Sequence, residues 1–258
     1  MLSALLLLLG FFAGMLGAMT GIGGGVLLTP ILALHFGIPV RQAIGASLVA
    51  VITTSAASSS VHLQRHATDI RLGMPLELAT SFGAAVTAYL VRYFNRNVLE
   101  GLVAGFLGYS SITILVPGGT VKNEERHRDP ALPAPALSAG LAASLVAGGL
   151  SGLLGIGGGP IKVPVMFNFM NVPLMVATAT SNFMIGVTAT ASAIVDYRRG
   201  DTLVELAAPL DVGVFLGSLL GARLAPRIKT RYVIYLLVAI MFYLAGHLIV
   251  HLFKGGAA

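Results

Sequence analysis

Long apolar segments separated by short polar stretches make up most of the 258-residue chain. A helix needs about 20 apolar residues to span a lipid bilayer. Eight segments reach or approach that length: residues 1–19, 41–63, 75–93, 98–116, 136–154, 177–195, 209–224 and 232–253. We therefore predict an all-α, polytopic membrane protein with about eight transmembrane helices.

Two further apolar segments, residues 26–36 and 161–169, are too short to cross a bilayer comfortably as helices. Each directly follows the pentapeptide Gly-Ile-Gly-Gly-Gly, which occurs at residues 21–25 and 155–159. Glycine clusters interrupt helices, so we predict two half-helices that begin after breaks in the backbone. Such breaks are tolerated at membrane depth only where they face protein or a wet cavity, so they should face the bundle interior.

The two pentapeptides lie 134 positions apart, and the same shift aligns residues well beyond the glycines. The aligned pairs include Leu16 with Leu150, Pro30 with Pro164, Pro39 with Pro173, Ser47 with Ser181 and Arg65 with Arg199. Similarity at a fixed period indicates a duplicated structural unit. We therefore divide the chain into a first transmembrane repeat (1–116), a polar linker loop (117–135) and a second transmembrane repeat (136–258).

The relative orientation of the two repeats depends on whether the half-helices cross the membrane. If they are re-entrant, each repeat crosses four times and the repeats are parallel; if they cross, each repeat crosses five times and the repeats are inverted. Lys and Arg are divided almost evenly between the two sides if the half-helices are re-entrant and less evenly if they cross, and the difference is small, so the positive-inside rule decides little between these arrangements. We favour the inverted arrangement.

The first apolar segment has a second interpretation, as a cleaved signal peptide. A signal peptide carries a basic region ahead of its apolar stretch, and residues 1–19 lack one. The glycine cluster that follows also has a counterpart in the second half of the chain. We therefore keep this segment as a mature helix.

Composition supports a membrane location. Hydrophobic residues make up 56% of the chain and charged residues 10%, and the mean hydropathy is +0.88, whereas soluble domains carry about 25% charged residues. The net charge of +6 comes mostly from Arg and Lys between the apolar segments, which indicates contact with anionic lipid and not with nucleic acid. The chain has no cysteine, which excludes disulfides and thiolate metal sites.

The glycine breaks are candidates for an anion site. A half-helix that starts there presents backbone N–H groups without intrahelical partners, together with the positive end of the helix dipole. The candidate substrate-binding residues of the two breaks are Gly23, Gly24, Gly25, Gly157, Gly158 and Gly159. The alternative is that these glycines only allow helices to pack closely, as small residues do in membranes.

Lys162 is a candidate for the charge that would attract such an anion. It lies three positions after the second glycine cluster, inside an apolar segment, and an ionisable residue in such a place is a candidate functional residue. The alternative is that its side chain extends to the membrane interface. The first repeat has Leu28 at the aligned position, so any contribution of charge is asymmetric.

The segments after the half-helices carry scattered hydroxyl and amide side chains, for example at residues 53–55 and 188–192. In the same segments, four polar residues are candidate ligands for oxyanion oxygens: Ser47, Thr180, Ser181 and Asn182. The alternative is hydrogen bonding between helices, which is common among small polar residues in membranes.

Other polar residues fit structural roles better. Glu77 and Asp211 are aligned by the repeat, and each follows a proline by two residues, the pattern of an acidic residue in the first turn of a helix. His247 and His251 lie four residues apart, but no carboxylate or cysteine accompanies them as a metal ligand. We find no nucleophile with its base, phosphate loop or pair of acids, so we predict neither catalysis nor a cofactor or metal.

The paired glycine clusters with Pro30 and Pro164, together with Ala179-Thr180-Ser181, closely resemble the sulfite exporter TauE/SafE family over nearly the full chain. Gly45-Ala46-Ser47 in the first repeat lacks the threonine, so that half is expected to contact ligand less fully. The resemblance implies a multi-pass permease of the plasma membrane, in bacteria usually the inner membrane. It also implies export of sulfite or related organosulfonates.

We therefore expect a secondary transporter that moves a small anion out of the cell by alternating access. A passive anion channel, a carrier of another small solute or of a cation, and a scaffold without transport remain alternatives. The expected partners are the small anion and the lipid bilayer, with a homodimer left open. The substrate, the coupling ion and the direction of transport are not fixed by the residues.

Overall fold

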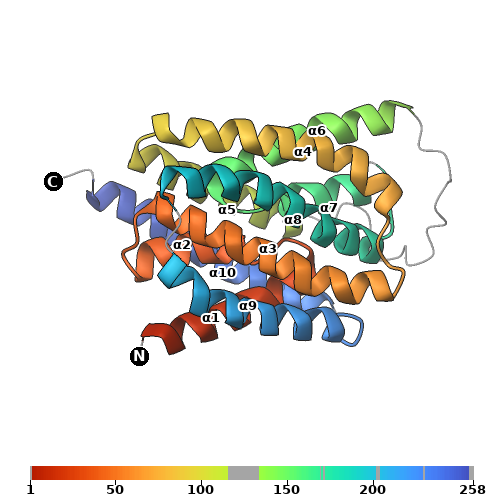
Figure 1. Cartoon of the computed structure of the whole chain (residues 1–258), viewed down its shortest axis with the longest axis horizontal. Coiled ribbons are helices and arrows are strands. Elements are labelled where there is room, and N and C mark those ends of the chain that lie inside the picture. The colour runs from red at the N-terminus through yellow and green to blue at the C-terminus, as the bar shows by residue number, and fades with distance from the viewer. Residues whose placement is uncertain are drawn as a thin grey trace.

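The computed structural model describes residues 2–115, 134–168, 170, 172–201, 204–228 and 230–255. Within these ranges the secondary structure is entirely helical (Figure 1). The helices are α1 (Leu2–Thr20), α2 (Gly25–His35), α3 (Val40–Gln64), α4 (Ile70–Leu90), the 3-10 helix η1 (Val91–Tyr93), α5 (Arg96–Leu115), α6 (Ala134–Leu154), α7 (Gly159–Asn168), α8 (Leu174–Arg199), α9 (Val204–Leu224) and α10 (Thr230–Gly255).

Seven helices in the described part of the chain are long and apolar enough to cross a membrane: α1, α3, α4, α5, α8, α9 and α10. Shorter apolar helices are α2 and the Ser138–Leu154 part of α6. The prediction of an all-α membrane protein with half-helices after the glycine breaks is confirmed, since α2 begins at Gly25 and α7 at Gly159. Most of the predicted linker, residues 117–135, lies outside the described residues.

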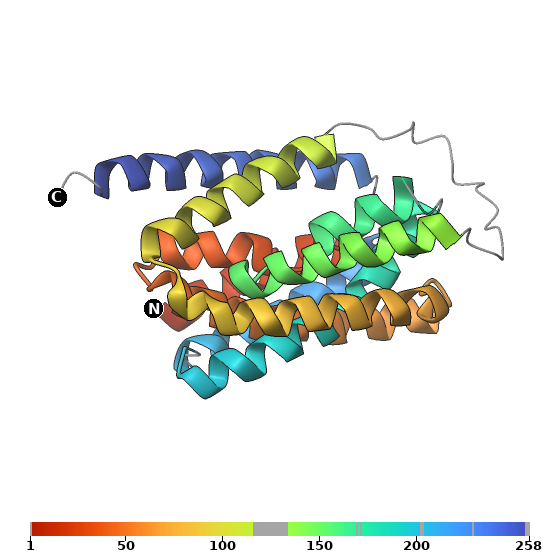
Figure 2. The same cartoon turned by 90° about the horizontal axis from the view of Figure 1, so that it is seen from above.

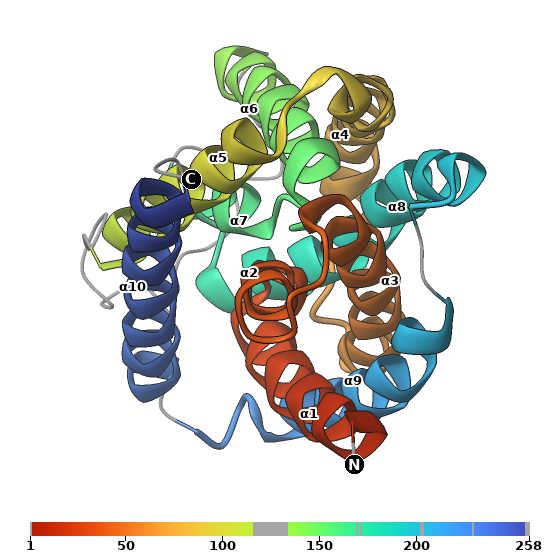
Figure 3. The same ribbon diagram turned by 90° about the vertical axis from the view of Figure 1, so that its left-hand side faces the viewer.

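The first two helices form a hairpin at one end of the molecule. α1 starts at the end that carries the N-terminus, α2 returns to that end, and α3 starts there (Figures 1 and 3). α6 and α7 form a similar hairpin at the opposite end, where α8 starts. α3 and α8 therefore run in opposite directions. We counted residues 1–19 as a full crossing, and on that count re-entrant half-helices go with parallel repeats. In the structure, α2 returns to the end where α1 starts, and α3 and α8 nevertheless run in opposite directions.

The helices pack in pairs that are exchanged by the 134-residue shift. α1 packs along α9, and α6 packs along α4 (Figures 2 and 3). α3 packs against α8, and α5 against α10, so each of these helices contacts its own counterpart. The first and second parts of the chain are therefore interlocked, because α1 lies against a late helix and α4 against α6.

Glycine allows the closest of these pairs to form. A Cβ atom on Gly213 or Gly217 of α9 would collide with the carbonyl oxygens of Leu7 and Phe11 in α1. α6 shows the same relationship to α4, through Gly148 and Gly152. Small residues let membrane helices approach backbone to backbone, where dispersion replaces the hydrophobic effect as the driving force.

Candidate functional site

The two glycine loops meet in the interior of the bundle, and every residue of both is buried. A Cβ atom added to Gly159 would lie 2.5 Å from the carbonyl oxygen of Gly21, and one added to Gly25 would collide with the carbonyl oxygen of Gly155. Each loop thus packs its backbone on the backbone of the other. The prediction that the breaks face the interior therefore agrees with the structure, and the close-packing interpretation of the glycines describes part of their role.

The loop conformation requires glycine at two positions that the 134-residue shift aligns. Gly23 and Gly157 both have φ of +82°, a region that residues with a Cβ atom rarely adopt. In the first turns, the amides of Leu27 and Lys162 donate to the carbonyls of Gly24 and Gly158. Gly24, which precedes α2, has no side chain to cap the remaining amides.

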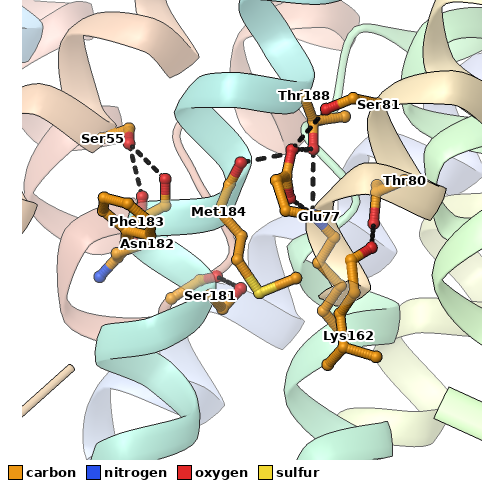
Figure 4. Close-up of polar contacts among 12 residues, drawn as sticks. Ser55, Glu77, Thr80, Ser81, Lys162, Ser181, Asn182, Phe183, Met184 and Thr188 are labelled. Carbon is orange, nitrogen blue, oxygen red and sulfur yellow. Dashed lines mark hydrogen bonds and ion pairs between the residues drawn. The ribbon is translucent and has the colours of Figure 1, made fainter. Parts of the chain in front are cut away.

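Two side chains of α8 bond to the first glycine loop and to the end of α1 that precedes it. The Ser181 hydroxyl donates to the carbonyl of Gly21 at 2.7 Å, and the Asn182 amide donates to the carbonyl of Ala18 at 2.9 Å. Ser55 on α3 in turn donates to the backbone carbonyl of Asn182 at 2.6 Å (Figure 4). Ser181 and Asn182 are therefore engaged as interhelical donors in this structure.

Ser47 and Thr180 have different surroundings. The Thr180 hydroxyl accepts the backbone N–H of Asp69 at 2.9 Å, and thereby joins α8 to the loop before α4 and not to a glycine loop. Ser47 is fully buried, and its Oγ has no hydrogen-bond partner among the described residues. The structure thus gathers the glycine loops with Ser181 and Asn182, and places Thr180 in a separate contact.

Lys162 belongs to a buried ionic cluster that joins three helices (Figure 4). Its Nζ lies 2.8 Å from Glu77 Oε2 on α4 and 3.0 Å from Thr188 Oγ1 on α8. The hydroxyls of Thr188 and Ser81 donate to Glu77 Oε1 at 2.6 and 2.8 Å. Lys162 is 3% exposed and Glu77 6% exposed. The interpretation of Lys162 as an interfacial side chain is therefore wrong.

The interpretation of Glu77 as a first-turn acid is also wrong. α4 begins at Ile70, because Asp69 caps it by accepting the N–H of Leu72 at 3.1 Å, and Pro75 lies inside the helix. Glu77 therefore lies two turns into α4, where its side chain reaches Lys162 on α7. The signal in the sequence was Lys162 itself, since a buried cation requires a nearby counter-charge.

The position of Asp211 in α9 corresponds to that of Glu77, and it too lies inside its helix. The helix start read from Pro209 is wrong for the same reason, since α9 begins at Val204. Asp211 Oδ1 is buried without a hydrogen-bond partner among the described residues. Because Leu28 stands at the position aligned with Lys162, the ionic cluster has no counterpart around Asp211.

Two surface cavities lie away from the glycine loops. One of about 390 Å³ lies between the ends of α3 and α9 and is lined by Arg65, Arg223 and Arg227 together with apolar side chains. The other, of about 340 Å³, is lined by the α3–α4 loop, Pro173 and Val176. Among the described residues, no group of three His, Asp or Glu side chains is arranged to hold a metal ion.

An all-helical bundle with seven helices of membrane-crossing length defines a multi-pass membrane protein. The family model for the sulfite exporter TauE/SafE family matches residues 6–248. The chain therefore belongs to this family, which is a family of membrane transporters.

The curated relatives agree with that assignment. The probable membrane transporter protein YunE of Bacillus subtilis is 26% identical, and the alignment covers 95% of this chain and 96% of the relative. The probable membrane transporter protein YdhB of the same organism is also 26% identical, over 92% of this chain and 97% of the relative. A sulfite exporter TauE/SafE family protein of Arabidopsis thaliana is 34% identical over 39% of this chain and 24% of its own length.

The chain matches no solved structure. The relatives are named transporters and not enzymes, which confirms the expectation of a protein without catalysis. The resemblance read from the duplicated glycine clusters is confirmed as well.

Proposed function

We propose that this protein is a secondary transporter of the plasma membrane that exports a small anion, sulfite or an organosulfonate, by alternating access. The observation that carries the proposal is Lys162, a buried cation in the first turn of a half-helix. Charged side chains at membrane depth are costly, and those present commonly mark substrate pathways. The family membership supports sulfite or a sulfonate as the class of anion.

The anion would bind at the start of α7. The ammonium group of Lys162 supplies the charge, and the backbone N–H groups of residues 157–159 supply donors at the positive end of the helix dipole. In broken-helix transporters of duplicated sequence, half-helix N-termini point at anionic substrate groups in the same manner. The interlocked pairs α1–α9 and α4–α6 would move relative to α3 and α8 to expose the site on alternate sides.

Flux measurements in proteoliposomes test the proposal. The protein should give saturable flux of sulfite and of a simple alkanesulfonate, with little flux of chloride or of a cation. The double variant Lys162→Met, Glu77→Met removes both charges of the cluster, so it should fold without an unpaired buried charge and should lose this flux. Lys162→Arg should keep part of it.

Other results would point elsewhere. Flux that rises linearly with anion concentration and shows no exchange would favour a passive channel. Full anion flux in the double variant would remove Lys162 from the mechanism, and selective flux of a cation would contradict anion transport altogether.

A further inference from the structure

We propose that the carboxylate of Glu77 occupies the place of the transported anion, and that its protonation releases Lys162 to bind one anion together with one proton. This inference rests on the proposed function and assigns the coupling ion of the same site. The observation behind it is that Lys162 is not a free cation: an acidic side chain of the protein already neutralises it.

The hydrogen bonds of the cluster show what an incoming anion would have to replace. Glu77 Oε2 accepts from Lys162, and Glu77 Oε1 accepts from Thr188 and Ser81. All three donors converge on one carboxylate (Figure 4). When the carboxylate leaves, the three donors remain, and they come from α7, α8 and α4. A sulfite or sulfonate group has three acceptor oxygens and fits such a set.

The charge of the cluster favours a strict exchange of one anion for one carboxylate charge. In the empty state the positive Lys162 is balanced by the negative Glu77, and with anion bound it is balanced by the anion while Glu77 carries a proton. Both states are neutral. A second negative charge, or none, would leave an uncompensated charge in a site of low dielectric, which costs several kcal/mol per ion.

Among the described residues, the charged groups on the elements packed around the cluster are engaged elsewhere or exposed. Glu100 of α5, a helix that contacts α7, pairs with Arg96 at 2.6 Å, and Asp69 caps α4 by accepting the N–H of Leu72. α6, which packs along α4, has no charged residue, and Lys162 is the only charged residue of α7. On α8, Asp196 and Arg199 pair with each other at 2.5 Å, more than two turns beyond Thr188. Arg92 in η1 is exposed and lies over the ring of Tyr89. α4 itself otherwise carries only Arg71, which is exposed in its first turn.

Equilibrium binding of methanesulfonate to the purified full-length protein tests the inference, because a sulfonate keeps its single negative charge over the whole accessible pH range. Isothermal calorimetry in two buffers of different ionisation enthalpy measures the protons taken up. The wild type should take up one proton per anion, and over the pH range in which it does so its affinity should fall by up to about tenfold for each unit of pH rise.

Glu77→Gln imitates the protonated state. This variant should bind methanesulfonate at least as tightly as the wild type at low pH, without proton uptake and without dependence on pH. Asp211→Asn is the matched control, because Asp211 is the aligned acid in α9 and its Oδ1 has no hydrogen-bond partner in the part of the chain that the structure describes. This control should retain both the proton uptake and the pH dependence.

Three results would overturn the inference and leave the proposed function standing: anion binding by the wild type without proton uptake, proton uptake that persists in Glu77→Gln, or proton uptake that is lost in Asp211→Asn. The first needs no variant, so the test holds even if Glu77→Gln fails to fold. Absence of binding of both sulfite and methanesulfonate to the wild type at every pH would overturn the proposed function, and the inference with it.

Discussion

Ser47 and Ser181 are aligned by the 134-residue shift, but their hydroxyl groups have different surroundings. Ser181 donates to the first glycine loop, whereas the hydroxyl of Ser47 is buried without a partner among the described residues. A buried hydroxyl that is not hydrogen-bonded carries a free-energy cost that a ligand or a second conformation would remove. Substitution of the two serines can therefore distinguish a structural hydrogen bond from a hydroxyl that is available to a ligand.

We predict that Ser181→Ala lowers the free energy of unfolding by about 1–3 kcal/mol, because the buried carbonyl of Gly21 loses its donor. Ser47→Ala should leave stability unchanged or slightly raised. Thermal unfolding of both variants in the same detergent measures the difference. Equal destabilisation by the two substitutions would contradict the assigned hydrogen bond.

If Ser47 is a ligand donor in another state of the transport cycle, Ser47→Ala should reduce anion flux in proteoliposomes without lowering the unfolding temperature. Unchanged flux would remove Ser47 from the candidate site and leave it as a packing residue.

The half-helices α2 and α7 depend on backbone contact between the two glycine loops. Gly25, the first residue of α2, packs on the carbonyl oxygen of Gly155, and Gly159, the first residue of α7, packs on that of Gly21. Neither helix start can therefore move independently of the other. Side chains at these positions would push the loops apart. The α5 helix offers the opposite case, since a Cβ atom on Gly105 meets nothing within 4 Å.

We predict that Gly159→Ala destabilises the protein by more than about 2 kcal/mol, because the new Cβ atom would lie 2.5 Å from the Gly21 oxygen. Gly105→Ala should be neutral or stabilise the helix by about 0.5–1 kcal/mol, as expected where alanine replaces glycine in an open helical position. Unfolding temperature and the yield of monodisperse protein measure both. A Gly159→Ala protein as stable as the Gly105→Ala control would contradict the loop packing.

The directions of the helices make a prediction about the sidedness of the membrane. His66 follows α3, Asn95 lies between η1 and α5, and the exposed Arg198 lies in the last turn of α8. α3 ends at one end of the bundle, whereas α8 ends and α5 begins at the other (Figure 1). The chain has no cysteine, so single substitutions give one reactive thiol each.

His66→Cys should react with a membrane-impermeant maleimide from one side only, and Asn95→Cys and Arg198→Cys from the other side. Intact and permeabilised vesicles distinguish the two sides. Labelling of all three from the same side would contradict the opposite directions of α3 and α8.

Much of the architecture was predictable because it follows from local chemistry. Apolar length marked the spanning helices, and glycine clusters marked the two half-helix starts. The ion pair was not predictable in the same way, because Lys162 and Glu77 are 85 residues apart and nothing local shows that α4 and α7 are neighbours. Pro75 was also wrongly interpreted as the start of α4, because the Asp69 cap starts this helix more than a turn earlier.

The interlocking of α1 with α9 and of α4 with α6 has a consequence for how the protein is made. α1 leaves the ribosome long before α9 has been synthesised. Its glycine-lined face therefore lies in the bilayer without its final partner until α9 has been inserted. Premature termination after α5 would strand both α1 and α4 in this condition. Quality-control proteases should therefore remove such a fragment. If the rest of the chain, with α6 and α9, is synthesised separately, the two fragments should be able to reassemble.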